Sequence, residues 1–163
     1  MTRILFVCTG NTCRSPMAEV IARDRAARRG LEVEVDSAGL MTGPGSPAAE
    51  HARRLAAERG LDLGAHRSSV LTPDLLALSD LVLGMTGRHV DALRVAQPGA
   101  EVQLVTAFLP PGHPLAGAEI PDPFGGSPAD YAATWNRLEV AIEALLDRLE
   151  TGGDGASDGG AGE

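Results

Sequence analysis

Residues 3–16, RILFVCTGNTCRSP, constrain the fold of this chain more than any other segment. The apolar run 3–7 is typical of a short buried strand, and it ends directly before Cys8. Pro16 suits the first position of a helix, and Ser15 can serve as its N-cap. We therefore expect a strand and a helix joined by a short loop. Consecutive backbone N–H groups in such a turn, with the helix N-terminus, form a cradle for an anion.

The side chains of this loop add chemistry to the expected anion cradle. Gly10 lets the backbone curl close to a ligand. Arg14 supplies a planar, permanently charged group that can bind two phosphate oxygens. Cys8 lies where the N–H groups, the helix dipole and Arg14 favour a thiolate over a thiol. One loop thus offers both a nucleophile and a receptor for an oxyanion of phosphate shape.

The rest of the chain alternates between strand and helix patterns. We expect helices at 15–30, 48–59, from 73 onward, 88–96 and 129–150, and strands at 31–36, 80–85 and 101–105. Strand 31–36 alternates in polarity and is expected nearer an edge. Alternating strands and helices predict an α/β domain with a parallel sheet covered on both faces. Ligands of such sheets bind at the carboxyl ends of the strands, which is where Cys8 lies.

Two segments lack such patterns. Residues 109–128 are rich in Pro and Gly and predict a long loop, which is often functional. Residues 151–163, TGGDGASDGGAGE, predict a disordered Gly/Asp-rich tail outside a domain formed by residues 1–150.

Composition excludes several classes of function. The net charge is -8, from 22 acidic residues against 14 basic ones, which argues against a nucleic-acid partner. No apolar run is long enough to span a membrane, so we expect no membrane partner. The N-terminal apolar run is too short for a signal peptide, so we expect a cytoplasmic protein. The two Cys and four scattered His residues do not have the spacing of metal ligands, so no metal is expected. We expect the chain to act as a monomer.

The segment 8–16 resembles the N-terminal motif C-x-G-N-x-C-R-S-P of the low-molecular-weight protein-tyrosine-phosphatases, and the resemblance covers roughly residues 3–150. It implies a three-layer α/β/α fold with a four-stranded parallel sheet and a phosphate-binding loop between the first strand and first helix. It also implies a phosphocysteine intermediate, formed without a metal or other cofactor. The residues implied to bind the substrate are Thr9, Gly10, Asn11, Thr12, Cys13, Ser15 and Phe124.

The resemblance also assigns roles around the nucleophile. Members of this family carry a general acid in an Asp-Pro dipeptide on a late loop, which here is Asp122-Pro123. Cys8 would attack phosphorus while Asp122 protonates the leaving atom, and Asp122 would then activate the hydrolytic water. Ser15 would donate its hydroxyl to the Cys8 thiolate. Because Ser15 also suits an N-cap, both roles remain open.

Three further residues are implied to support the loop rather than to touch the substrate. Asn11 would brace the loop through side-chain hydrogen bonds, His66 would pack beneath it, and Ser37 would have a similar bracing role. Cys13 is either a small buried hydrophobe or the partner of a reversible disulfide with Cys8.

The identity of the phosphorylated residue depends on two positions. Thr12 stands where the tyrosine phosphatases carry a bulky apolar residue, and it resembles the bacterial protein-arginine phosphatases. A hydroxyl there suits a polar guanidinium. Phe124 is followed by Gly125 rather than by a second aromatic residue, and Phe124 can stack on a guanidinium. We therefore predict that phosphoarginine in proteins is preferred over phosphotyrosine.

Functions of other classes remain open at this point. An arsenate reductase would also use a loop with this Cys-to-Arg spacing, although no further Cys follows Cys13 to relay electrons. A non-catalytic anion or redox sensor would have no use for Asp122.

Overall fold

The computed structural model describes the backbone from Met1 to Gly162 and the side chains of residues 1–152. Its centre is a parallel sheet with the strand order β2-β1-β3-β4, which confirms the four-stranded sheet that we expect. The strands are β1 (Thr2–Cys8), β2 (Val33–Gly39), β3 (Leu81–Gly84) and β4 (Val102–Leu104). The edge position expected for the second strand is also observed.

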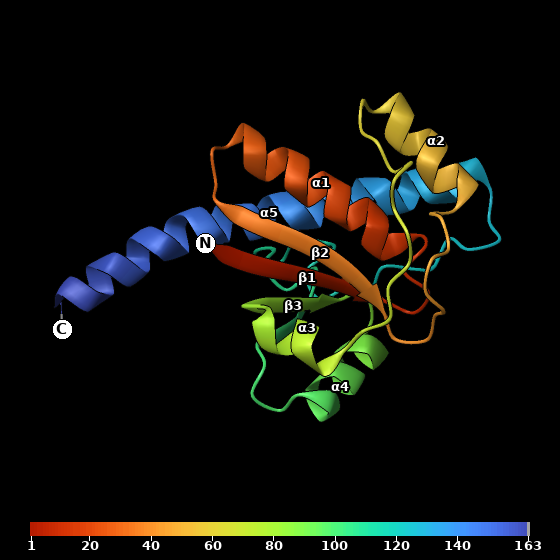
Figure 1. Ribbon diagram of the computed structural model, residues 1–163. Helices are drawn as coiled ribbons and strands as arrows, with labels where there is room; N and C mark the ends of the chain where they lie inside the picture. The colour runs from red at the N-terminus through yellow and green to blue at the C-terminus, as the bar shows by residue number, and fades with distance from the viewer. Residues whose placement is uncertain (163) are drawn as a thin grey trace.

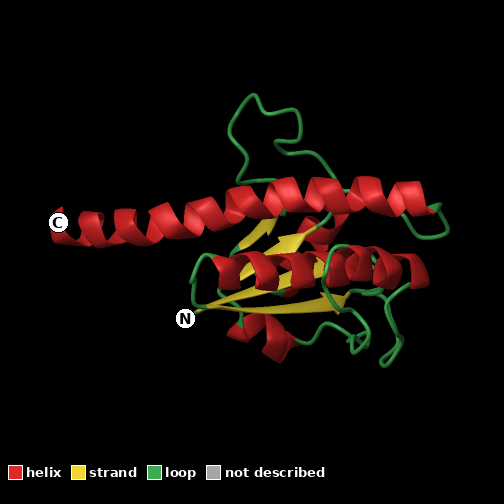
Figure 2. Cartoon of the chain, turned by 90° about the horizontal axis from the view of Figure 1, so that it is seen from above, coloured by secondary structure: helices red, strands yellow, loops and turns green. Residues whose placement is uncertain are grey.

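Helices cover both faces of the sheet. They are α1 (Arg14–Arg28), α2 (Glu50–Glu58), α3 (Pro73–Leu78), α4 (Gly87–Ala96) and α5 (Pro128–Gly162). Figure 1 shows α1, α2 and α5 on one side of the strands and α3 and α4 on the other, and Figure 2 shows α1 and α5 running along the sheet. The three-layer α/β/α architecture is therefore confirmed.

The central strand β1 explains this layering. Ile4 and Phe6 belong to the core under α1 and α5, whereas Leu5 and Val7 belong to the core under α3 and α4. All four side chains are at most 1% exposed. A strand that is buried on both faces must be apolar at successive positions, which is why residues 4–7 form an apolar run and do not alternate. The same run places Cys8 at the carboxyl end of the central strand.

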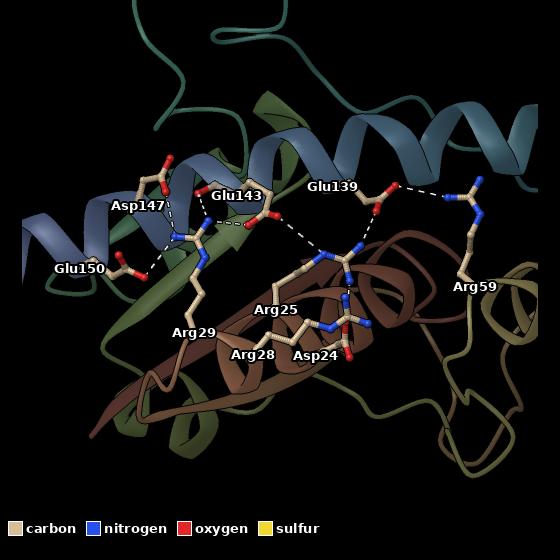
Figure 3. Close-up of polar contacts among 9 residues, drawn as sticks. All are labelled: Asp24, Arg25, Arg28, Arg29, Arg59, Glu139, Glu143, Asp147 and Glu150. Atoms are coloured by element: carbon tan, nitrogen blue, oxygen red, sulfur yellow. Dashed lines mark hydrogen bonds and ion pairs between the residues drawn. The ribbon is translucent and has the colours of Figure 1, made fainter.

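A network of ion pairs joins α1 to α5 on the outside of the molecule (Figure 3). Arg29 contacts Glu143 at 2.6 Å and Asp147 at 2.8 Å, and Arg25 contacts Glu139 at 2.5 Å. Exposed pairs of this kind contribute about 0–1 kcal/mol each, so apolar packing rather than charge holds the two helices together. The network still fixes how α5 lies along α1.

Two local expectations at the loop need correction. Helix α1 begins at Arg14 with Cys13 in the N-cap position, and no side chain caps it. The N-cap role of Ser15 is therefore wrong, because its hydroxyl is used inside the loop described below. Strand β2 begins two residues and ends three residues later than the sequence pattern indicates, and its last residue, Gly39, pairs with Cys8.

The last helix, α5, is assigned as far as Gly162. The disordered tail that the sequence predicts at residues 151–163 stays a prediction. Among the residues that the structure describes, no helix combines the length and the apolar character needed to cross a membrane.

Candidate active site

The loop that joins β1 to α1, called here the Cys8–Arg14 loop (residues 8–14), turns its carbonyl groups outward. The carbonyl of Cys8 accepts a hydrogen bond from Leu40 N, that of Thr9 from Met41 N, and that of Thr12 from Ala49 N, at 2.9–3.0 Å. Within the described part of the chain, the N–H groups of residues 9, 10, 12 and 13 have no protein acceptor. Outward carbonyls and unpaired N–H groups produce the concave anion cradle that the sequence predicts.

Two backbone details allow this curvature. Asn11 has a φ of 55°, the left-handed conformation that asparagine tolerates better than most residues. The end of β2 approaches the loop so closely that a Cβ on Gly39 would lie 2.9 Å from the Thr9 carbonyl oxygen. Only glycine fits at position 39 without displacing the loop.

A buried chain of hydrogen bonds ends on the Cys8 sulfur. Asn11 Nδ2 donates to Ser15 Oγ at 2.8 Å and to Ser37 Oγ at 2.9 Å. Because Ser15 Oγ already accepts from Asn11, its hydroxyl proton is available for Cys8 Sγ, which lies 3.0 Å away. The backbone N–H of Asn11 also points at Cys8 Sγ, at 3.3 Å. Two hydrogen-bond donors thus point at the sulfur of the predicted nucleophile.

Asn11 is the residue that connects this chain to the rest of the fold. Its side-chain oxygen accepts from Ser69 N at 2.8 Å, and its carbonyl oxygen lies 2.8 Å from His66 Nε2. Ser37 in turn donates to Glu19 Oε1 at 2.5 Å. The structure therefore brings Asn11, Ser37 and His66 together beneath the loop, with Glu19 and Ser69 added to the set.

Arg14 lies at the other side of the cradle. Its side chain is buried. The guanidinium nitrogen Nη1 donates to the Ile120 carbonyl at 3.0 Å, and Nη2 lies 3.6 Å from the Asp122 carboxylate. Its Nε is buried and has no acceptor among the described residues. A buried, unpaired guanidinium N–H is costly, and an oxyanion in the cradle would satisfy it.

Asp122 reaches this site from the loop that precedes α5, called here the Asp122 loop (residues 121–127). Its side chain is 49% exposed, and Oδ1 accepts from Phe124 N at 3.1 Å. Together, the two loops enclose a cavity of about 210 Å³. Its lining consists of Cys8, Thr9, Gly10, Thr12, Cys13, Arg14, Asp122 and Phe124. The phenyl ring of Phe124 is 74% exposed at this cavity.

Cys13, the second cysteine, faces away from the nucleophile's donors. Its sulfur lies 3.3 Å from the hydroxyl of Tyr131, on α5. Burial raises the pKa of the Cys13 thiol, in spite of the hydrogen bond from Tyr131, and burial also raises the pKa of Tyr131. Both groups therefore stay protonated near neutral pH. Both cysteines are free.

Most of the site residues expected from the sequence meet at one place, but the sequence analysis missed others. These are Glu19, Ser69, His89 and Tyr131. Glu19 follows the motif by one turn of helix on the side that faces the loop, a signal that could have been used. Ser69 acts through its backbone and Tyr131 lies in an apolar stripe, so neither has a signal in the sequence.

The described residues contain no cluster of three or more His, Cys, Asp or Glu side chains arranged to hold a metal ion. The groups that the site itself presents are the Cys8 sulfur, a guanidinium, a carboxylate and backbone N–H groups. Such a set can bind a tetrahedral oxyanion, attack its central atom and move a proton to or from an attached atom.

The fold and this loop define a phosphatase with a cysteine in its phosphate cradle, and comparison with known proteins supports this class. The family described as low molecular weight phosphotyrosine protein phosphatase matches residues 3–153. The chain belongs to this family and is an enzyme that hydrolyses phosphate from its substrates.

Relatives in this family carry two different names. The chain is 39% identical over 149 residues to a protein-arginine-phosphatase of Bacillus subtilis, covering 90% of this chain and 96% of the relative. It is 35% identical to the low molecular weight protein-tyrosine-phosphatase Etp of Escherichia coli, covering 90% and 93%. A solved YwlE arginine phosphatase mutant with a phosphorylated active-site serine has a TM-score of 0.84 and 37% identity, covering 91% of this chain and 96% of that one.

Proposed function

We propose that this enzyme removes phosphate from phosphoarginine in proteins, with Cys8 as nucleophile and Asp122 as general acid and base. The observation that carries the proposal is the lining of the cavity, to which both Thr12 and Phe124 contribute. A hydroxyl at this position can accept a hydrogen bond from a guanidinium N–H, whereas a branched alkyl group would leave that N–H without a partner. The relative named protein-arginine-phosphatase supports the same substrate.

In the first step, the Cys8 thiolate attacks phosphorus from the floor of the cradle. The phosphoryl oxygens receive hydrogen bonds from the loop N–H groups and from Arg14, including the unpaired Nε. As the S–P bond forms, the P–N bond breaks. The protonated Asp122 carboxyl, at the open side of the cavity, gives its proton to the departing nitrogen, which leaves as part of a guanidinium.

In the second step, Asp122 works as a base. The carboxylate takes a proton from a water molecule while the water oxygen attacks phosphorus in phospho-Cys8. The S–P bond breaks, phosphate leaves, and the sulfur returns to the thiolate form. Ser15 and the N–H of Asn11 stabilise that leaving thiolate, since both lie within 3.3 Å of Sγ.

The Asp122 loop also supports the proposed substrate. Only one aromatic side chain, Phe124, follows the Asp-Pro dipeptide, and Gly125 has a φ of +78°. This left-handed conformation favours glycine, so a second aromatic wall at 125 would strain the loop. The open side leaves room for a planar guanidinium to stack on Phe124.

Parallel kinetics on a phosphoarginine peptide and a phosphotyrosine peptide of the same sequence test the proposal, with Cys8→Ser as the blank. We expect kcat/KM to favour phosphoarginine by about tenfold or more, since one lost hydrogen bond to a charged group costs about 1.5–3 kcal/mol. Thr12→Ile should reduce that preference, whereas Thr12→Ser, which keeps the hydroxyl, should retain it.

Several outcomes would contradict the proposal. A preference for phosphotyrosine in the unaltered enzyme would make it a tyrosine phosphatase. An unchanged ratio of phosphoarginine to phosphotyrosine hydrolysis in Thr12→Ile would mean that Thr12 does not select the substrate.

The partner in this proposal is a phosphorylated protein, and the acidic chain, with its net charge of -8, would not repel an Arg-rich segment. We further propose that it acts as a monomer in the cytoplasm, which gel filtration and cell fractionation would test.

A further inference from the structure

A histidine outside the catalytic set holds the loop residue that follows the nucleophile. His89 lies on α4, behind the wall of the cradle, and its ring nitrogen Nε2 is 2.9 Å from Thr9 Oγ1. The His89 side chain is buried. Thr9 is thus anchored on two sides, because its carbonyl oxygen also accepts from Met41 N.

The other ring nitrogen of His89 fixes the direction of this hydrogen bond. Nδ1 faces the backbone N–H groups of Met85 and Thr86, at 3.3 and 3.2 Å. It must accept from them, so it carries no proton, and the proton of the neutral ring is on Nε2. Nε2 therefore donates to Thr9 Oγ1. Burial and the positive charge of Arg14 lower the pKa of His89 to about 4, which keeps this neutral form at physiological pH.

The fold leaves His89 little freedom to move. Its backbone N–H donates to Thr86 Oγ1 at the first turn of α4, which completes a reciprocal cap. A Cβ on Gly84, at the end of β3, would lie only 2.9 Å from the Cβ of His89, so the ring is set close against the sheet. A rigid donor on a helix cap is suited to hold a loop in place.

We propose that His89 is a positioning residue: through its hydrogen bond to Thr9 it holds the backbone after Cys8 so that the Thr9 N–H points at the phosphate. This inference rests on the proposed phosphate chemistry of the loop and not on the choice of phosphoarginine. It links α4 and the end of β3 to the cradle.

Two substitutions at His89 test the roles of its two ring nitrogens separately. His89→Asn places an oxygen near the position of Nδ1 and keeps the acceptor for the cap, but it cannot reach Thr9. His89→Gln places a donor nearer the position of Nε2. His113→Asn is a matched control, since His113 Nδ1 also accepts a local backbone N–H, from Leu115, and its ring contacts no residue of the Cys8–Arg14 loop within the described chain.

Hydrolysis of para-nitrophenyl phosphate and inhibition by inorganic phosphate provide the readouts. We expect His89→Asn to lower kcat/KM by about three- to tenfold, the effect of one buried hydrogen bond, and to raise the inhibition constant of phosphate by a similar factor. His89→Gln should recover part of the loss, and His113→Asn should behave as the unaltered enzyme.

A double-mutant cycle with Thr9→Val distinguishes positioning through Thr9 from a general loss of packing. If His89 acts through the Thr9 hydroxyl, His89→Asn adds no further loss in the Thr9→Val background. An equal loss in both backgrounds, or no loss in either, would overturn the inference. If His89→Asn does not fold, Thr9→Val and His89→Gln still test the contact. An unaltered enzyme without phosphatase activity would contradict the proposed function instead.

Discussion

The two loops that form the site are built in opposite ways. In the Cys8–Arg14 loop, Asn11 and Arg14 are at most 4% exposed, and the carbonyls are held by neighbouring segments. In the Asp122 loop, the side chain of Asp122 is 49% exposed and Phe124 is 74% exposed. The hydrogen bonds that the structure describes within residues 121–127 are short-range ones, such as Gly126 N to the Pro123 carbonyl.

This difference matches what each loop has to do. The Cys8–Arg14 loop must present donors to a charged group without reorganising, and a loop whose carbonyl groups and Asn11 side chain are held by neighbouring segments meets that need. The Asp122 loop must admit a substrate side chain, give a proton and then admit water. A loop with few long-range bonds can adjust between these steps. Substitutions in the first loop should therefore affect both stability and catalysis, whereas those in the second should affect catalysis alone.

The largest effect is expected at the nucleophile. Cys8→Ser should lower kcat by about 10⁴-fold or more, because the serine hydroxyl does not ionise near neutral pH. Single-turnover and steady-state assays would measure the loss. Cys13→Ser provides the contrast, with a loss of about tenfold or less. Equal losses at both cysteines would contradict the assignment of Cys8.

Asp122→Asn should have the next largest effect. The amide cannot donate a proton to the leaving atom, so kcat on a phosphopeptide should fall by about 10²- to 10⁴-fold. The loss should be smaller on para-nitrophenyl phosphate, whose leaving group needs less protonation. Thermal unfolding should be unchanged, because Asp122 is half exposed.

Asp130→Asn is the control for Asp122→Asn. Asp130 lies in the first turn of α5 and accepts from Ser127 N, a bond that asparagine can keep. This variant should retain full activity. Losses that do not depend on the leaving group would mean that Asp122 binds the substrate and does not transfer the proton.

Asn11→Ala tests most directly whether the Cys8–Arg14 loop contributes more to stability than the Asp122 loop does. It removes the side-chain partners of Ser15, Ser37 and Ser69 and places alanine at a φ of 55°. Together, these changes should lower the free energy of unfolding by about 2–3 kcal/mol. Phe124→Ala should change it by less than about 0.5 kcal/mol. Denaturant unfolding measures both variants. Similar decreases in the free energy of unfolding would contradict the difference between the two loops.

The parts of the molecule that could be predicted from sequence are those with local signals. The apolar run before Cys8 and the helix starter Pro16 give the strand, loop and helix, because each signal lies within the element it defines. The tertiary partners could not be obtained in this way. His89 meets Thr9 across 80 residues, and its own segment shows only a short helix. Of the two roles that the sequence leaves open for Ser15, the structure has the hydroxyl beside Cys8 and not the N-cap.

The smallest effect, and the most specific to His89, is on the pH dependence of stability. Burial and the charge of Arg14 lower the pKa of His89 from 6.5 to about 4 in the folded state, so below pH 6.5 the unfolded state takes up a proton that the folded state does not. The contribution of His89 to stability is thus fully present above pH 6.5 and is lost as the pH falls toward 4. Between pH 6 and pH 5 the loss should be about 1 kcal/mol.

His89→Asn has no group that titrates at this position. Its free energy of unfolding should therefore fall by about 1 kcal/mol less than that of the unaltered protein between pH 6 and pH 5. His113→Asn should follow the unaltered protein. Parallel slopes for all three proteins would mean that His89 is protonated with the same ease in both states, and hence that it does not remain neutral beside Thr9.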